Sequence, residues 1–375
     1  MLLSRKIRLC PDRQQEEILW RSSGVARWVY NWVLNQQQQN YYSKGAKFIS
    51  SGALRKELTQ LKKTEEFNWL GSVSNNVAKQ AVKDACDAYK KFFEKRASKP
   101  RFKSKKKSRP SFYNDSVKLK IKLNKRVLIE KVGWVKTAEQ IPTGVKYYNP
   151  RITYDNKYWY LSVGIEQEDT KKELTENILG IDLGIKDLAI CSDGQTFRNI
   201  NKTEVVKKTE KRLRRLQRKV SRKYEMNKEG SRFAKTCNII KVEKQIRHLH
   251  RRLTNIRTNH IHQATNALVK TKPKRVVMED LNIRGMMKNR HLAKAIKNQK
   301  LYEFTRQMKY KCEKYGIDFV QVSRFYPSSK TCSSCGEVKK DLRLSNRVYR
   351  CECGLEIDRD LNAAINLAKY GELMN

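Results

Sequence analysis

The sequence lacks long apolar segments. No run of 18 apolar residues occurs in its 375 positions, and the first residues, MLLSRKIRLCPDRQQEE, lack the apolar stretch of a signal peptide. A transmembrane helix needs about 20 consecutive apolar residues, and a secretory leader has a charged start followed by an apolar core. The sequence therefore predicts a cytoplasmic protein, whose nine cysteines are expected to be free thiols or metal ligands instead of disulfides.

Acidic residues are scarce relative to basic ones. The chain has 38 Asp and Glu against 82 Lys and Arg, which gives a formal net charge of +44. A compact fold with that excess repels itself and attracts polyanions, so we predict that the protein binds nucleic acid. The main alternative, a basic protein of the membrane surface, needs a strongly apolar amphipathic face or a lipidation signal, and the sequence shows neither.

Several other signatures are missing. The five histidines form no ligand or catalytic cluster, no GxxxxGK[ST] phosphate-binding loop occurs, and no repeat of 20 to 50 residues is present. These absences argue against a P-loop nucleotide-binding protein and against a solenoid. Carboxylates and cysteines remain as the residues available for chemistry.

The first hundred residues predict helices followed by a basic segment. Apolar residues at helical spacing follow Pro11 and Asp12, and a second apolar stripe runs through residues 72–96. The next segment, KPRFKSKKKSRP at 99–110, is dense in cations and has no periodicity. It is either a flexible tether or a loop that grips phosphates, with phenylalanines and a tyrosine nearby for stacking.

A period of two follows the basic segment and indicates β structure. Apolar residues alternate with lysines over 117–123, which predicts a half-buried strand, and RITYDNKYWYLSVGI at 151–165 predicts a hairpin. We interpret this region as a small antiparallel β-barrel that also recruits a strand from residues 2–9. The helices would then be an insertion, and a polar link over 166–177 would lead to the rest of the chain.

Strands and helices alternate from residue 177 onward. NILGIDLGIKDLAICSDGQTF at 177–197 predicts two strands joined by a glycine-containing turn. Residues 204–270 are intensely basic with narrow apolar seams, which predicts a helical hairpin that packs on a sheet. KRVVMEDL at 274–281 predicts a short buried strand that ends in acid.

The cysteines near the end of the chain form two tight pairs. Cys332 and Cys335 lie in CSSCG, Cys351 and Cys353 lie in CECG, and 15 residues separate the pairs. Two such knuckles, each with a turn glycine, are typical of a tetrahedral Zn²⁺ site with four thiolates, which is closed and therefore structural. Disulfide pairing or a chance spacing is the alternative. The other cysteines are isolated, and we expect them to fill apolar cores: Cys10, Cys86, Cys191, Cys237 and Cys312.

Three carboxylates occur beside apolar segments. Asp182 lies within LGIDLGI, Glu279 ends the strand RVVME, and Asp360 begins the helical pattern DLNAAINLA. Acids on two neighbouring strands and a helix can together bridge a pair of Mg²⁺ ions about 3.5–4 Å apart, as in phosphodiester hydrolysis. Alone, Asp182 could cap a turn and Glu279 could be ion-paired at a strand end.

Two further acids lie beside the predicted site residues. We expect Asp358 to be the N-cap of the last helix or a supporting contact. Asp280 is expected to point away from its neighbour Glu279 if the strand continues.

Four blocks of the sequence, in order, resemble the signature blocks of one family: ILGIDLGIKDLAICSDG, VVMEDLNIRGM, RFYPSSKTCSSCGEVK and YRCECGLEIDRDLNAAINLA. They resemble the TnpB (OrfB) family of insertion-sequence proteins, which is related to the compact type V CRISPR effectors. The resemblance implies an α/β multidomain fold, in which an RNase H-like (RuvC) nuclease domain carries an inserted zinc ribbon. The N-terminal half would be a small β-barrel interrupted by a helical domain.

The resemblance also implies domain boundaries. A wedge-like β-barrel would comprise residues 1–10 and 110–170, and a helical recognition domain with the basic linker would comprise 11–109. The RuvC-like nuclease domain would span 177–375. Within it we expect the basic helical hairpin at 204–270 and the zinc ribbon at about 325–357.

The same resemblance assigns the site residues. Asp182, Glu279 and Asp360 would be catalytic and would hold two Mg²⁺ ions, for which Mn²⁺ could substitute; in DRDLN the family pattern Asp-x-Asn selects Asp360 over Asp358. One structural Zn²⁺ would be held by Cys332, Cys335, Cys351 and Cys353. The second knuckle is expected to mount the start of the helix that carries Asp360.

The implied partners are a guide RNA from the transposon end and double-stranded target DNA cut next to a short flanking motif. We expect one copy of the protein in the ribonucleoprotein, a location at the nucleoid of a prokaryotic cell, and no membrane association. Three alternatives remain: an RNA-guided DNA-binding regulator without cleavage, a guide-independent RuvC or resolvase-type nuclease, and a strand-transfer transposase.

Overall fold

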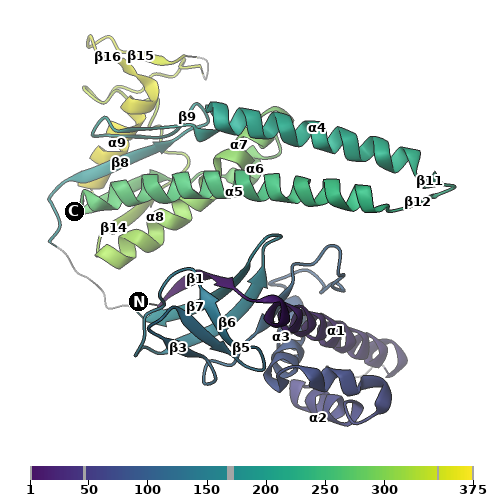
Figure 1. The fold of residues 1–375 in the computed structure, drawn as a ribbon. Coiled ribbons are helices and arrows are strands. Elements are labelled where there is room, and N and C mark those ends of the chain that lie inside the picture. The colour runs from purple at the N-terminus through teal and green to yellow at the C-terminus, as the bar shows by residue number, and fades with distance from the viewer. Residues whose placement is uncertain (1, 45–47, 167–172, 344–345, 374–375) are drawn as a thin grey trace. The chain divides into compact units, whose positions relative to one another are not determined.

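The computed structural model describes residues 2–44, 48–166, 173–343 and 346–373. The chain forms two compact units, Met1–Gln167 and Glu168–Asn375, which we call the first and second units (Figure 1). The polar link predicted over 166–177 lies partly outside the described residues.

The first unit is an antiparallel sheet with helices inserted after its first strand. Its helices are α1 (Arg13–Lys44), α2 (Ser51–Leu61), a 3-10 helix (Glu65–Ser72) and α3 (Asn75–Phe93). Its strands are β1 (Leu2–Cys10), β2 (Ser111–Tyr113), β3 (Lys120–Lys122), β4 (Arg126–Ile129), β5 (Gly133–Thr137), β6 (Tyr147–Tyr154) and β7 (Trp159–Glu166). The strand order is β2-β6-β7-β1-β5-β4-β3, which confirms that the N-terminal strand joins the sheet.

The prediction of a closed barrel is wrong. Strands β2 and β3 have three residues each and lie at opposite ends of the strand order, so the described sheet has two edges. The strand predicted over 117–123 is also shorter than expected, since β3 contains only Lys120–Lys122. Val117 and Leu123 are 81% and 80% exposed, and Leu119 is the buried residue between them. Alternation of apolar and basic residues along the sequence therefore does not by itself show that the whole segment pairs with a neighbouring strand.

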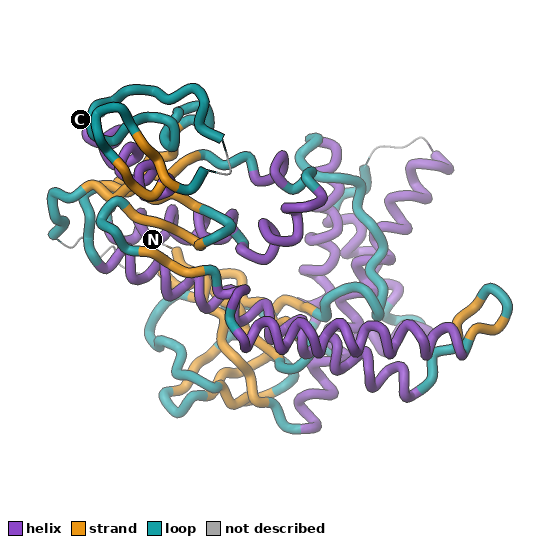
Figure 2. The backbone as a smooth tube through the Cα atoms, turned by 90° about the horizontal axis from the view of Figure 1, so that it is seen from above, coloured by secondary structure: helices purple, strands orange, loops and turns teal. Residues whose placement is uncertain are grey.

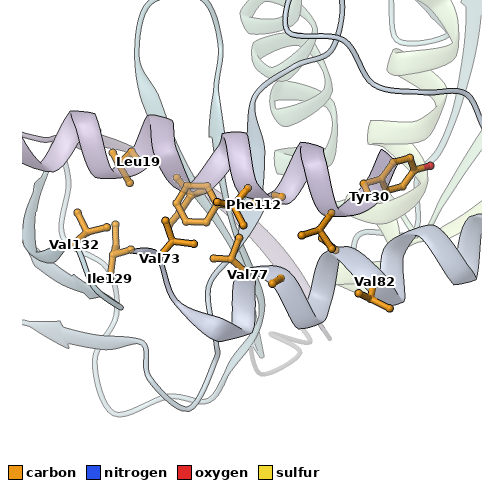
Figure 3. Packing of buried hydrophobic residues seen from close by; sticks show 14 of the residues in the cluster. Leu19, Tyr30, Val73, Val77, Val82, Phe112, Ile129 and Val132 are labelled. Atoms are coloured by element: carbon orange, nitrogen blue, oxygen red, sulfur yellow. The ribbon is translucent and has the colours of Figure 1, made fainter. Parts of the chain in front are cut away.

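The core of the first unit lies between the sheet and the two long helices. Leu19 of α1 and Val77 of α3 are buried together with Phe112 of β2 (Figure 3). The predicted turn at 155–157 joins β6 to β7, where Asn156 adopts a φ of 74° and the Asp155 carboxylate accepts a hydrogen bond from the Tyr158 amide. The hairpin prediction is confirmed.

The second unit contains a five-stranded mixed sheet. Its strands are β8 (Ile178–Leu183), β9 (Asp187–Cys191), β10 (Thr196–Arg198), β13 (Arg275–Glu279) and β14 (Asp318–Val322), in the order β10-β9-β8-β13-β14. β13 runs parallel to both β8 and β14, whereas β9 pairs antiparallel with β8 and with β10. The helices are α4 (Glu204–Met226), α5 (Cys237–Lys270), α6 (Ile283–Met286), α7 (Arg290–Gln299), α8 (Leu301–Tyr315) and α9 (Arg359–Glu372).

Helices cover both faces of this sheet. Ile181 of β8 and Met278 of β13 share a buried cluster with Leu268 of α5 and with residues of α8. Val277 of β13 instead packs with Leu367 of α9. Because successive side chains of a strand point to opposite faces, α5 and α8 cover one face and α9 covers the other.

The predicted basic hairpin is present as α4 and α5. The helices run antiparallel, and their tip carries two-residue strands β11 (Lys228–Glu229) and β12 (Arg232–Phe233) (Figure 2). Leu213, Leu249 and Leu253 form its apolar seam. Arg257 is partly buried in the hairpin and donates to Glu210 at 2.7 Å. No described helix has the length and apolarity of a membrane span.

Candidate active site and zinc centre

The three predicted acids come from neighbouring elements of the second unit. Asp182 is on β8, Glu279 is the last residue of β13, and Asp360 is in the first turn of α9. β8 and β13 pair in parallel, with Met278 opposite Ile181, so Glu279 and Asp182 come next on the two strands. Both acids therefore share the face that α9 covers.

The carboxyl of Asp182 is strongly influenced by the other acids. Burial raises its pKa to about 7, and the charges of Asp360 and Glu279 add to that rise, while Arg359 opposes it. Burial, together with the charge of Asp280, also raises the pKa of Glu279. Like charges held close in a poorly solvated site favour the neutral form in this way. The fold thus concentrates negative charge near the carboxyl ends of β8 and β13.

Basic side chains partly neutralise Asp360. Arg359 donates to Asp360 Oδ1 from 3.0 Å, and the guanidinium of Arg347 lies 3.8 Å from Oδ2. Within the described ranges, the four cysteines form the one group of three or more potential ligands close enough to hold an ion. The acids are therefore within electrostatic range of one another without forming a compact ligand set.

Gly180 allows α9 to approach the strand that carries Asp182. A Cβ at Gly180 would overlap the carbonyl oxygen of Ala364 and lie 2.6 Å from the amide nitrogen of Ala368. On the helix side, a Cβ at Gly371 would lie 2.7 Å from the Val277 side chain. The distance between Asp182 and Asp360 thus depends on the absence of a side chain at position 180.

We predict that Gly180→Ala destabilises the second unit by about 1–3 kcal/mol or more, because the backbone atoms it meets cannot move without displacing α9. Thermal unfolding measures the effect. Gly24→Ala is the matched control, since no atom lies within 4 Å of its Cβ on α1, and it should be neutral or slightly stabilising. Equal melting temperatures for Gly180→Ala and the unmodified protein would contradict the close approach.

One neighbouring acid has the position expected of it, whereas the condition set for Asp280 is not met, because β13 ends at Glu279. Asp358 is the N-cap of α9, and its carboxylate accepts hydrogen bonds from the amides of Asp360 and Leu361 at 2.9 and 3.2 Å. Asp280 follows the end of β13 and binds Arg324 at 2.5 Å. The N-cap prediction is confirmed.

The four predicted cysteine ligands converge. Cys332 and Cys353 have their sulfur atoms 3.6 Å apart, as do Cys335 and Cys351, and all four sulfurs lie within 4.8 Å of one another. Tetrahedral Zn²⁺ with Zn–S bonds of about 2.3 Å requires sulfur separations of about 3.8 Å. The cluster therefore fits a structural zinc site.

Each knuckle turns at a glycine. Gly336 and Gly354 have φ of 81° and 89°, a conformation that side chains disfavour. Their amides donate back to the carbonyls of Cys332 and Cys351 at 3.0 and 3.1 Å. These turns fold the chain so that both cysteines of a pair face one point.

The four-cysteine cluster is connected directly to α9. The second knuckle lies between β15 (Val348–Arg350) and β16 (Glu356–Asp358), and β16 runs into the helix at its N-cap, Asp358. Asn362, which is fully buried, donates to the carbonyl of Thr331 at 2.7 Å and accepts from the amide of Ser333 at 3.0 Å. The first knuckle is thereby bonded to the helix that carries Asp360.

A second asparagine repeats this connection one turn along α9. Asn366 donates to the carbonyls of Ser328 and Thr331 at 2.8 and 2.6 Å, and Lys369 donates to that of Ser333. The sequence analysis missed both asparagines. They could have been found from the sequence, because they are two side-chain amides four residues apart on an otherwise apolar helix face. A polar group buried on such a face needs hydrogen-bond partners.

The prediction for the isolated cysteines is correct for three of five. Cys86, Cys191 and Cys312 are buried, whereas Cys10 and Cys237 are exposed. Cys10 is the last residue of β1 and Cys237 is the first residue of α5, and both side chains are exposed to solvent. Isolation in the sequence says nothing about which face of an element a residue occupies.

Three family descriptions match parts of the chain. Residues 161–290 match a family described as "Probable transposase" (OrfB_IS605), residues 302–367 match "Cas12f1-like, TNB domain", and residues 1–46 match "Helix-turn-helix domain". The described part of 1–46 contains strand β1 and one continuous helix, α1. The last description therefore differs from the local structure.

Relatives match over nearly the whole chain. A "Putative RNA-guided DNA endonuclease" of Streptomyces pristinaespiralis is 34% identical over 374 residues, covering 98% of this chain and 88% of the relative. InsQ of Escherichia coli (strain K12), with the same description, is 32% identical over 98% of this chain and 91% of its own. A TnpB-like protein of Acanthamoeba polyphaga mimivirus, L79, is 25% identical over 98% of this chain and 73% of its own.

Solved structures share the fold. The protein in a Cas12f1–sgRNA–target DNA complex superimposes with a TM-score of 0.62 at 14% identity, covering 98% of both chains. The mini-RNA-guided endonuclease Cas_phi3 gives a TM-score of 0.52 at 11% identity, covering 98% of this chain and 92% of the other. The α/β multidomain architecture is thus that of these effectors.

Proposed function

Since the chain belongs to the TnpB (OrfB) family, we propose that it is an RNA-guided endonuclease that cleaves double-stranded DNA beside a short flanking motif. The observation that carries this proposal is the placement of Asp182, Glu279 and Asp360 on β8, β13 and the first turn of α9, within electrostatic range of one another, in a chain with a net charge of +44. Relatives that match almost the full chain are described as RNA-guided DNA endonucleases, which supports the same reading.

The second unit supports a RuvC-like assignment. Its sheet has an antiparallel meander, β10-β9-β8, extended by the parallel strands β13 and β14. Asp182 and Glu279 lie on the adjacent strands β8 and β13, and Asp360 lies in the first turn of α9, which packs on the same sheet. We propose that this unit is the nuclease and that Asp182, Glu279 and Asp360 are its catalytic residues.

The three acids would hold Mg²⁺. Carboxylate oxygens are the ligands that Mg²⁺ prefers, with waters and phosphate oxygens completing its octahedron. The raised pKa of Asp182 fits this role, because a site that forces carboxylates together is one that a divalent cation would stabilise. When bound, a Mg²⁺ pair would activate water and stabilise the leaving oxygen. Arg359 would then have to release Asp360 or share it.

The basic surface is suited to a resident RNA. α4 presents exposed arginines along one side, and Arg214, Arg218 and Arg222 line an open hollow on it. Side chains spaced by four residues lie on one stripe of a helix, so these cations can follow a phosphate backbone. A guide-independent nuclease would not need so large an excess of positive charge.

A plasmid-cleavage assay tests the proposal. The chain is purified with its co-expressed RNA and incubated with Mg²⁺ and a plasmid that matches the 3′ end of that RNA. We expect cutting of the matched plasmid and none of an unmatched one. Cutting of both after RNase treatment would support a guide-independent nuclease, and binding without cutting would support a regulator.

A further inference from the structure

An aromatic pocket lies where the C-terminal ends of α1 and α3 meet in the first unit. Its volume is about 350 Å³, and its lining includes Gln38 and Tyr42 of α1, Tyr89 and Phe93 of α3, and Lys99 of the basic segment. Sites for small organic groups begin at about 300 Å³ and combine apolar walls with a few polar groups. We call this the aromatic pocket.

The rings of the pocket are unusually exposed. Tyr42 is 72% and Phe93 is 57% exposed, in a chain of which 32% is charged residues. Phe93 stacks on Tyr89, with ring centroids 5.9 Å apart and planes inclined by 26°, and meets Phe48 edge-on at 6.0 Å. The wall of the pocket therefore presents the aromatic surfaces of Tyr42 and Phe93 to solvent.

A buried hydroxyl in the pocket makes no well-formed hydrogen bond, although the Gln38 side chain lies beside it. Tyr89 is 5% exposed, and its hydroxyl oxygen is buried and makes no hydrogen bond within the described part of the chain. The pKa of Tyr89 is raised by burial, although the nearby Gln38 amide partly opposes this effect. Leaving a buried hydroxyl unsatisfied is unfavourable, because the group loses its bonds to water without replacing them. A ligand with a hydrogen-bonding edge would remove that penalty.

Cations border the pocket. The Lys99 ammonium lies 5.9 Å from the centre of the Tyr42 ring and begins the basic segment 99–110. That segment has no helix or strand, but it is fixed on α1, because the Asn31 amide pairs with both the backbone N–H and C=O of Lys103 at 2.8 Å. The charge favours an anionic occupant over a second copy of this chain, whose net charge is also +44.

We propose that the aromatic pocket binds one unstacked base of the bound RNA. Tyr42 and Phe93 stack on the base, the Tyr89 hydroxyl bonds its edge, and Lys99 contacts the adjoining phosphate. Proteins recognise RNA mainly through such splayed bases in loops, bulges and single strands, using aromatic stacking and hydrogen bonds to base edges. The inference rests on the proposed function, because it requires that an RNA be bound.

The test compares RNA affinities of single variants by filter binding, using the RNA that co-purifies with the unmodified protein. Tyr42→Ala should weaken binding by about fivefold or more, since stacking contributes about 1–3 kcal/mol per base. Tyr89→Phe should weaken binding by about threefold. It should leave the melting temperature of the RNA-free protein unchanged or higher, because only an unsatisfied hydroxyl is lost. Tyr302→Ala, which changes a 69% exposed tyrosine on α8, is the matched control and should bind normally.

The remaining outcomes separate the possible failures. Unchanged RNA affinity in both variants would overturn the pocket assignment and leave the proposed function standing. An unmodified protein that binds no RNA would overturn both. Loss of affinity for single-stranded DNA alone would assign the pocket to DNA instead. A dimer in light scattering that Tyr42→Ala dissociates, with RNA affinity unchanged, would assign the surface to a second copy.

Discussion

Asp182→Asn is expected to lower the rate of Mg²⁺-dependent DNA cleavage by roughly 10³-fold or more, while RNA binding stays intact. The substitution keeps the shape of the side chain and removes one of three charges that would hold the metal, and removal of a single electrostatic group from an active site has effects of this size. The measurement is the rate of cutting of a matched plasmid, with RNA affinity measured in parallel. Retained cleavage would refute the assignment of Asp182.

The same substitution should not destabilise the metal-free protein. Burial and two neighbouring carboxylates raise the pKa of Asp182 to about 7, well above that of an unfolded aspartate. The ionised side chain therefore lowers stability increasingly as the pH rises from about 4 to about 7. Asp182→Asn should match the unmodified protein near pH 4 and exceed it in melting temperature above pH 7, measured without added Mg²⁺.

A matched control is available nearby. Asp193 is exposed and lies in the turn between β9 and β10, where it binds Gln195. Asp193→Asn should cleave DNA at the normal rate and show no comparable gain in stability. Equal losses of cleavage in Asp182→Asn and Asp193→Asn would indicate a general effect of charge instead of a catalytic role.

Cys351→Ser is expected to lower the zinc content and destabilise the second unit by roughly 3 kcal/mol or more, because loss of a structural metal is among the most damaging single changes. Cleavage should fall with it, since β16 and the knuckle fix the start of α9. Zinc analysis and thermal unfolding measure the effects. Cys237→Ser, at an exposed and isolated cysteine, should behave like the unmodified protein.

Asn362→Ala separates the connection to the helix from the metal itself. All four thiolates remain, so zinc should stay bound, but the Thr331 carbonyl and the Ser333 amide lose their buried partner. The expected destabilisation is about 1–3 kcal/mol. We also expect a lower cleavage rate with unchanged RNA affinity, because Asp360 is two residues from the lost bonds. Normal cleavage by a zinc-loaded Asn362→Ala protein would show that the ribbon does not position Asp360.

Features that depend on local spacing could be predicted from the sequence. The cysteine pairs fold around their turn glycines, so the spacing of Cys332, Cys335, Cys351 and Cys353 was sufficient to predict the four-cysteine cluster. The N-cap role of Asp358 follows from its position before an apolar helix. Asp182 and Glu279 could be placed on buried strands of one sheet because parallel strands read as short, near-continuous apolar runs.

Features that depend on long-range packing could not be predicted. The first sheet ends at the short strands β2 and β3 and does not close. The alternation of apolar residues and lysines at 117–123 predicted a longer strand than β3, since Val117 and Leu123 are exposed. The aromatic pocket joins Tyr42 to Tyr89 and Lys99 through the packing of two helices. The partners of Asn362 lie about 30 residues away in the first knuckle, and Gly180 matters only because α9 crosses it.

Sequencing the RNA that co-purifies with the chain, expressed with its flanking DNA, shows whether recognition is guided. We expect one dominant RNA with a constant body that ends in sequence from beyond the edge of the encoding element. A heterogeneous mixture of cellular RNA, together with DNA cutting that needs none of it, would contradict guided recognition and leave a guide-independent nuclease.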